Sequence, residues 1–495
     1  ALRAVGVALT LITANAAAAM VAREKAPESS SNEVVSGAVI VELTGAPGAR
    51  ASRRAARAAA VQRASVRDFI IQSENQQRAA SGKRAAAAKA IVPHEYASVF
   101  NGLAARVSEK TARALKAHPD VKAIHVDGPV RAALDVSVPS VRAPEVWGDF
   151  GVRGAGVTIA VIDTGVDYTH PDLGGCFGPG CKVIGGYDFS NNDADPIDDQ
   201  GHGTHVAATA AGDGALLGVA PDASILAYKV LNASGSGSDS TVLAGIERAV
   251  DPNNDGNVAD HADVINMSLG GGGDENDPLS IAVDNATAIG VLSVIAAGND
   301  GSYFSIGSPG TARSALTVGA VNDADALASF SSRGPTTVDF LAKPEIVAPG
   351  VGICAAQFPG AFPGNECLGD DHAAISGTSM AAPHVAGAAA LVLSAQPNVT
   401  PQLLKALLIQ ASTPVNGDFV SVGRGRLDVR RALDFDTRIF PAHLNVGPNF
   451  GDDAVFAETT TFLVRNDGRS TQSYEVAVPA GSFPSATPAR ASTRR

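Results

Sequence analysis

From about residue 155 onward, continuous apolar runs alternate with segments of helical character; the runs include VTIAVID, SILAYKVL, VLSVIAAGN and ALTVGAV. A strand that is buried on both faces has to be apolar at nearly every position, so such runs between helices predict parallel strands. The pattern therefore predicts the α/β fold class, with a doubly wound, mostly parallel sheet. Ligands of such sheets bind beyond the carboxyl ends of the strands.

The chain has 495 residues, which is enough for about three domains. Its formal net charge of −12 argues against nucleic acid as a partner, because phosphate binding needs a basic face. The charge is unevenly distributed: residues 1–133 are net basic and the remainder is net acidic. Two parts of opposite sign attract each other, which favours an interaction between them.

Residues 1–20 have the layout of a secretory signal peptide. Arg3 precedes an apolar run of about a dozen residues that ends in small residues. The run is too short for a membrane span, and the chain is expected to have none. The alternative is a buried N-terminal helix.

The four cysteines form two close pairs, Cys176 with Cys181 and Cys354 with Cys367, and each pair brackets a loop rich in Gly and Pro. Four cysteines allow three pairings, of which the local one is the most economical. An exported chain favours disulfides over metal ligation. We therefore predict two local disulfides.

Polar clusters follow several of the apolar runs. Asp163 ends VTIAVID, His202 and Ser379 each stand at the start of a predicted helix, and Asn299 follows VIAAG. A serine hydroxyl becomes a nucleophile when an imidazole takes its proton and a carboxylate orients that imidazole. A helix start and a nearby amide offer donors for an oxyanion. Each residue alone has an ordinary structural explanation, as a turn former, a structural histidine or a helix cap.

Together, DTG at Asp163, HGTHV at His202, AAGN at Asn299 and GTSMA at Ser379 occur in the order of the subtilisin family of serine proteases, which the chain resembles over residues 140–434. The resemblance implies a subtilisin-like peptidase domain that acts as a monomer on polypeptides, with no cofactor required for the chemistry. It makes Asp163 the orienting acid, His202 the general base, Ser379 the nucleophile and Asn299 the oxyanion donor, and it gives His205 a structural part.

The same resemblance implies a substrate cleft. Ser268, Leu269 and Gly270 correspond to an edge segment that pairs with the substrate backbone, and a facing strand corresponds to Gly235, Ser236 and Gly237. A plain surface loop is the alternative for residues 235–237. Gly307 corresponds to the base of the primary specificity pocket.

Two flanking regions complete the predicted organisation. Residues 34–130 read as a small α+β unit and resemble the inhibitor-type propeptide of the family, with cleavage expected between about residues 126 and 140. The opposite charges fit such a pairing. Residues 436–495 are expected to form a partial β-rich segment with two strands, VFAETTTFLVRND and QSYEVAVPA, and a disordered tail. The expected product is a secreted enzyme.

Structural calcium is a further expectation. Asp172 in HPDL matches a calcium ligand of the family, although the loop that supplies most of the other ligands is short here. Asp251, Asn253 and Asp255 follow the start of a calcium loop, but Ala262 stands where that loop needs a glutamate. An ordinary Asn/Gly turn is the alternative for this second loop.

We therefore predict a secreted serine endopeptidase that is made as a self-processing precursor. Two other functions are the alternatives. A catalytically silent peptide-binding member of the family is disfavoured because all four catalytic positions are filled. An α/β-hydrolase esterase is disfavoured because those enzymes use G-x-S-x-G and a different chain order.

Overall fold

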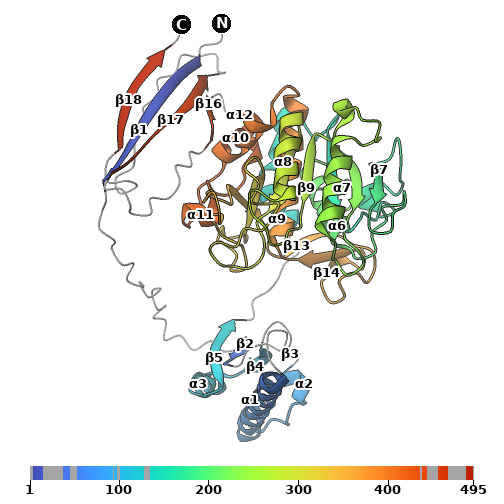
Figure 1. Ribbon diagram of the computed structural model, residues 1–495. Coiled ribbons are helices and arrows are strands. Elements are labelled where there is room, and N and C mark those ends of the chain that lie inside the picture. Colours follow the sequence, from blue (N-terminus) through green and yellow to red (C-terminus); the bar gives the residue numbers. More distant parts are fainter. Residues whose placement is uncertain are drawn as a thin grey trace. The chain divides into compact units, whose positions relative to one another are not determined.

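The computed structural model describes residues 4–14, 37–44, 53–92, 94–96, 101–126, 134–434, 437–442, 455–466 and 486–493. The chain divides into two compact units (Figure 1), one of residues 18–130 and one of residues 1–17 with 131–495.

A seven-stranded parallel sheet forms the centre of the larger unit, with the strand order β12-β11-β10-β9-β6-β8-β7. In chain order the strands are β6 (Thr158–Asp163), β7 (Val183–Asp188), β8 (Ser224–Lys229), β9 (Val264–Met267), β10 (Leu292–Ala296), β11 (Leu316–Val321) and β12 (Ile346–Pro349). Alternate residues of β6 face opposite sides: Ile159 and Val161 belong to one hydrophobic cluster, and Ala160 and Ile162 to another. This is why the strand had to be apolar throughout.

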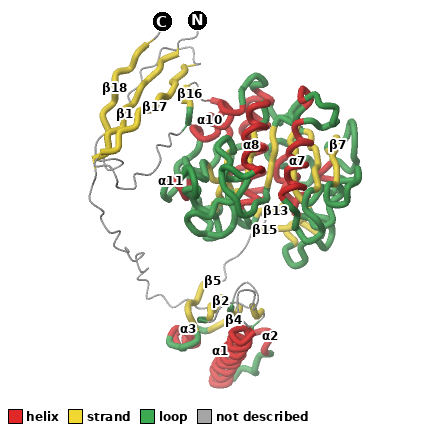
Figure 2. Tube along the Cα trace, in the orientation of Figure 1, coloured by secondary structure: helices red, strands yellow, loops and turns green. Residues whose placement is uncertain are grey.

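Helices cover both faces of this sheet (Figure 2). Residues of α7 (Asp239–Val250) and α8 (Pro278–Ile289) pack in one cluster, and those of α6 (His202–Ala211) and α9 (Thr378–Ala395) pack in the other. The predicted doubly wound α/β fold is confirmed. The other helices of this unit are α4 (Leu134–Ser140), α5 (Ala143–Phe150), α10 (Pro401–Ala411), α11 (Phe419–Val422) and α12 (Val429–Asp434), with 3-10 turns η2 (Pro171–Leu173) and η3 (Val258–Asp260).

Helix α9 is long and apolar enough to cross a membrane, but 78% of its apolar window is buried inside the unit. Its hydropathy therefore reflects its place in the core, where it contacts β9, β10, β11 and β12.

A small antiparallel sheet, in the order β13-β15-β14, lies in the same unit and carries one disulfide. Its strands are β13 (Ile353–Ala356), β14 (Glu366–Gly369) and β15 (His372–Ile375). The bridge joins Cys354 to Cys367, and a second bridge joins Cys176 to Cys181. Both predicted local pairings are confirmed.

The smaller unit is an α+β fold with a four-stranded antiparallel sheet in the order β3-β4-β2-β5. Its elements are β2 (Gly37–Leu43), α1 (Arg53–Ala80), α2 (Ala88–Ile91), β3 (His94–Tyr96), β4 (Gly102–Val107), α3 (Glu109–Lys116) and β5 (Val121–Val126). Val66 and Ile70 of α1 are fully buried against Val41 and Leu103 of the sheet. The unit therefore has a hydrophobic core of its own.

A further four-stranded sheet, in the order β16-β17-β1-β18, joins the two ends of the chain. Its strands are β1 (Ala4–Ala14), β16 (Thr437–Phe440), β17 (Val455–Asn466) and β18 (Ala486–Thr493). β17 coincides with one predicted strand, whereas QSYEVAVPA lies outside the described residues. Residues 4–14, which the sequence assigns to a signal peptide or a helix, are a strand here.

Residues 486–493 form the strand β18. The prediction of a disordered tail is therefore wrong for these residues. β18 pairs antiparallel with β1 between Val5 and Leu11. Composition reports only a segment's own tendency, and it cannot show that a distant segment supplies the backbone partners a strand needs.

Candidate active site

Asp163 and His202 are brought together by the close packing of α6 on the loop after β6. Asp163 is the last residue of β6, and His202 is the first residue of α6. A Cβ on Gly203 would lie 2.1 Å from the carbonyl oxygen of Gly165 and 3.1 Å from Asp163 Cβ. Only glycine permits this approach, so the second Gly of GHGTHV sets the distance between the carboxylate and the imidazole.

The contact joins His202 Nδ1 to Asp163 Oδ1 at 2.8 Å, and the same oxygen accepts a hydrogen bond from Thr164 N at 2.7 Å. The Asp163 side chain is fully buried, whereas that of His202 is 23% exposed. Burial alone would lower the pKa of His202, but the charge and hydrogen bond of Asp163 outweigh it and raise that pKa. The pair is thus suited to hold a proton on the imidazole.

The N-terminus of α6 is fixed by Asp198. Its Oδ1 accepts from the backbone N–H groups of Gln200 and Gly201, and its Oδ2 accepts from Thr204 N and Oγ1. These bonds satisfy donors that a helix start leaves unpaired. They therefore hold the turn that presents His202.

Ser379 is the second residue of α9, and its hydroxyl donates to the carbonyl oxygen of Ser268 at 3.1 Å. In this rotamer the hydrogen of the Ser379 hydroxyl is therefore bonded to the Ser268 carbonyl and not to His202. Transfer of its proton to His202 would require it to leave that carbonyl.

The amide oxygen of Asn299 is hydrogen-bonded to the neighbouring helix start. Its Oδ1 accepts from Thr378 N at 2.9 Å and from Thr378 Oγ1 at 3.1 Å. These two bonds identify the oxygen end of the amide, so Nδ2 is the end that can donate. Asn299 and Ser379 line the same cavity, of about 720 Å³.

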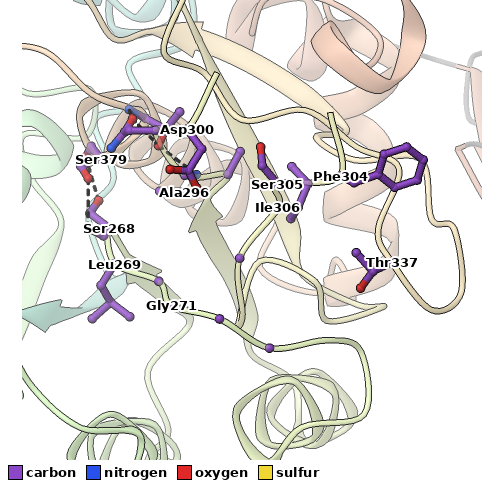
Figure 3. Close-up of a pocket in the computed structure, with 18 residues that line it drawn as sticks. Ser268, Leu269, Gly271, Ala296, Asp300, Phe304, Ser305, Ile306, Thr337 and Ser379 are labelled. Carbon is purple, nitrogen blue, oxygen red and sulfur yellow. Dashed lines mark hydrogen bonds between the residues drawn. The ribbon is translucent and has the colours of Figure 1, made fainter. Parts of the chain in front are cut away.

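That cavity, whose lining residues are drawn in Figure 3, shares one wall with a second cavity. It is bounded by Ser268, Leu269 and Gly270 on one side, with Ala296, Asp300, Phe304, Ile306, Gly307 and Thr337 among its other lining residues. The second cavity, of about 550 Å³, is lined by the same three residues together with His202 and residues 234–239. The structure thus gathers His202 and Ser379 along one cleft that follows residues 268–271.

Gly307 lines the first cavity, and residues 235–237 line the second. Residues 235–237 line the second cavity together with residues 268–270, but they belong to a loop and not to a strand. Gly307 lines the first cavity, where a Cβ would lie 2.7 Å from the carbonyl oxygen of Gly271. Glycine is therefore required at residue 307 by a close approach of two backbones as well as by the space of the cavity.

His205 is fully buried and structural. Its Nε2 faces the carbonyl oxygens of Ile353 at 2.9 Å and of Ala373 at 3.0 Å, so that nitrogen carries the hydrogen. Burial lowers the pKa of His205 to about 3. The residue ties α6 to the small sheet β13-β15-β14.

The donors around Asp172 do not fit a calcium ligand. Its Oδ1 accepts from Ala215 N at 2.7 Å, and its Oδ2 accepts from Leu216 N at 3.2 Å and from His372 Nε2 at 2.9 Å. Burial would raise the pKa of Asp172, but His372 and the two amides outweigh it and lower that pKa. Calcium needs oxygen lone pairs, and here three protein N–H groups already take three of the about four that a carboxylate offers.

The loop at residues 251–257 follows the turn alternative. Asp251 accepts from the backbone N–H groups of Asp255 and Gly256, Asn253 Oδ1 accepts from Asp255 N, and Asp255 Oδ1 accepts from Asn257 N. All of these residues are exposed or half-buried. The side chains cap their own backbone, as Asn and Asp do in turns.

Sequence reasoning missed Asn266 and Thr378. Asn266 Nδ2 donates to Ser268 Oγ at 3.1 Å, and Thr378 orients the Asn299 amide. Asn266 is a polar residue in the run VINM, and all four residues of that run are buried. A polar residue inside an apolar run was the signal that could have pointed to it. Thr378 lies within GTSMA itself, next to Ser379.

Two family models match this chain. Residues 154–429 match the model of the subtilase family, and residues 39–133 match that of peptidase inhibitor I9. Subtilisin E of Bacillus subtilis (strain 168) is 37% identical over 342 residues, which cover 67% of this chain and 80% of that protein. Serine protease AprX of the same strain is 38% identical over 312 residues, which cover 58% of this chain and 69% of that protein.

Among solved structures, a cold adapted subtilisin-like serine proteinase is 36% identical, with a TM-score of 0.45. The match covers 56% of this chain and 88% of that one.

Proposed function

The chain belongs to the subtilase family of serine peptidases and carries an inhibitor I9 propeptide domain, and on that premise we propose that it is a secreted endopeptidase that hydrolyses peptide bonds through an acyl-enzyme on Ser379. The observation that carries the proposal is the arrangement of Asp163, His202, Ser379 and Asn299 along one cleft. These four side chains supply the base, its orienting acid, the nucleophile and an oxyanion donor.

In the proposed first step, the Ser379 hydroxyl leaves the Ser268 carbonyl oxygen and gives its proton to His202 Nε2 as Oγ attacks the substrate carbonyl carbon. Asp163 holds the hydrogen on Nδ1, so Nε2 carries the lone pair that accepts the proton. The resulting imidazolium returns that proton to the leaving amine, and the amine departs from the acyl-enzyme. Water activated by the same imidazole then releases the acid.

The charge that develops on the substrate oxygen needs donors already in place. Asn299 Nδ2 is one, because Thr378 holds the other end of the amide. The Ser379 backbone N–H is a second, since it lies in the first turn of α9, where N–H groups have no helical acceptor.

The substrate backbone is proposed to lie along residues 268–270, opposite residues 235–237. An extended peptide added to a strand edge gains main-chain hydrogen bonds, and its alternate side chains enter pockets. The two cavities on either side of residues 268–270 are suited to those side chains.

The precursor is proposed to carry a signal peptide in residues 1–20 and an intramolecular inhibitor in residues 34–130, removed by cleavage between about residues 126 and 140. The inhibitor family match over residues 39–133, the separate core of this unit and the opposite charges of the two parts support this role. The two disulfides favour an extracellular product.

Labelling with a fluorophosphonate tests the nucleophile. The wild-type protein should become covalently labelled at Ser379 and should hydrolyse denatured casein. Ser379→Ala should lose both properties while remaining folded, because only one oxygen is removed. Labelling at another serine, or casein hydrolysis by purified Ser379→Ala, would overturn the assignment.

A further inference from the structure

Helix α9 lacks one backbone hydrogen bond because of its sequence. In an α-helix the carbonyl of residue i accepts from the N–H of residue i+4. Four residues after Ser379 comes Pro383, which lies inside α9 and has no N–H. The carbonyl of the proposed nucleophile is therefore left without its helical donor.

Ser268 supplies the missing donor from the neighbouring strand end. Its hydroxyl donates to the Ser379 carbonyl oxygen at 2.7 Å, while the Ser379 hydroxyl donates to the Ser268 carbonyl oxygen at 3.1 Å (Figure 3). Ser268 follows directly after β9 and is only 3% exposed. Two reciprocal bonds thus join the helix of the nucleophile to the edge of the substrate cleft.

Asn266 contacts the same Ser268 hydroxyl on its acceptor side. Its Nδ2 donates to Ser268 Oγ at 3.1 Å, and a serine hydroxyl has only one hydrogen to give. With Oγ accepting from Asn266, that hydrogen is directed to the Ser379 carbonyl. Asn266 is fully buried and, within the described part of the chain, its Oδ1 has no hydrogen-bond partner. An unpaired buried oxygen costs about 1–3 kcal/mol, so the position is not explained by stability alone.

We infer that the Asn266 and Ser268 side chains are positioning residues for Ser379: they replace the hydrogen bond that Pro383 removes and hold the nucleophile in register with the cleft. The inference rests on the proposed role of Ser379. The main chain of Ser268 is proposed to pair with the substrate, and the inference adds a separate role for the Ser268 hydroxyl. Misplacement of a reacting group by about 1 Å costs on the order of a hundredfold in rate.

The first experiment measures kcat, KM and thermal midpoint for Ser268→Ala. We expect kcat to fall by about 10- to 100-fold, KM to stay within about twofold, and the fluorophosphonate labelling rate to fall with kcat, since that probe needs no peptide binding. Ser293→Ala is the matched control, because Ser293 is a fully buried serine whose hydroxyl has no partner among the described residues. Its kcat should equal that of the wild type.

The second experiment asks whether the residues act as one chain. Because Asn266 works through Ser268, the double variant Asn266→Ala/Ser268→Ala should have the kcat of Ser268→Ala. Pro383→Ala restores an N–H for the same carbonyl, so the loss caused by Ser268→Ala should be smaller in that background. A loss of the same size with and without Pro383, or an unchanged kcat in Ser268→Ala, overturns the inference.

Two further results keep the test decisive. If Ser268→Ala does not fold, the nearly isosteric Ser268→Cys replaces it; a thiol is a weak donor, so kcat should still fall, and a wild-type kcat would overturn the inference. If the wild-type protein itself is neither active nor labelled at Ser379, the proposed function fails first, which separates that failure from this one.

Discussion

Asn299 illustrates how one residue serves two roles through the two ends of its amide. The oxygen end accepts two hydrogen bonds from Thr378, and the nitrogen end is thereby left as the donor on the side of the cavity. The direction of an amide is set by its hydrogen bonds, so Thr378 decides what Asn299 can do. The motifs located Asn299, but only the structure shows that its neighbour orients it.

The prediction for this residue concerns rate and not binding. Asn299→Leu keeps the approximate size of the side chain and removes the donor. We expect kcat to fall by about the hundred- to thousandfold that loss of such a donor causes in subtilisin, with KM nearly unchanged. Steady-state kinetics on a peptide substrate measures this. A fall in kcat of less than about threefold, in a variant with a wild-type thermal midpoint, would remove Asn299 from the proposed mechanism.

Other residues show why sequence reasoning reached only part of the site. The motifs of Asp163, His202 and Ser379 are local in the chain, so the sequence alone could point to these residues as candidates. The Ser268–Ser379 contact spans 111 residues, and the His372–Asp172 contact spans 200. Such pairs depend on how segments far apart in the chain are packed, which one sequence does not display.

Helices α9 and α6 each contain a buried histidine that the proposed chemistry does not use. His384 of α9 lies between the Met380 carbonyl at 2.8 Å and the Ser137 hydroxyl at 2.9 Å. Burial lowers the pKa of His384 to about 4 and that of His205 to about 3. Both histidines are therefore neutral in the folded protein at pH values where they are protonated in the unfolded chain.

This predicts acid destabilisation of the large unit. A histidine in the unfolded chain binds a proton below about pH 6.5, whereas folded His384 does not until about pH 4. Its contribution to stability is therefore complete above about pH 6.5 and is lost as the pH falls toward 4. In His384→Gln, the thermal midpoint should drop less between pH 7 and pH 5 than in the wild type. Equal drops in the two proteins would contradict the assignment of a neutral buried imidazole.

The elements themselves were predictable to different degrees. The apolar runs predicted the parallel strands because burial on both faces dictates their composition. For residues 235–237 the loop alternative holds in place of the strand, whereas strand β18 departs from the prediction. In the first, Asn232 Oδ1 accepts from the backbone N–H groups of Ser234 and Ser236 and favours a turn. In the second, β1 supplies the partner from the other end of the chain.

For the whole molecule, the sheet order explains why distant motifs meet. β6 lies between β8 and β9. Strands β7 and β8 are added on one side of β6, and β9 to β12 are added on the other side, so the strand order changes direction at β6, which ends at Asp163. Crevices form beyond the carboxyl ends of strands at such a point. β9 and β10 then bring Ser268 and Asn299 to the same edge. The alternation of strands and helices predicted the edge, but it did not predict which strands are neighbours.

The central claim is that Ser379 is the nucleophile of a precursor that processes itself, and intact mass measures this most directly. Wild-type protein and Ser379→Ala would be expressed in an export-competent host that lacks its own extracellular proteases. We predict that the wild type loses its N-terminal part up to a bond between about residues 126 and 140, while Ser379→Ala keeps residues 34–130 and loses only the signal peptide. Retention of residues 34–130 by both proteins, or their removal from both, would contradict the claim.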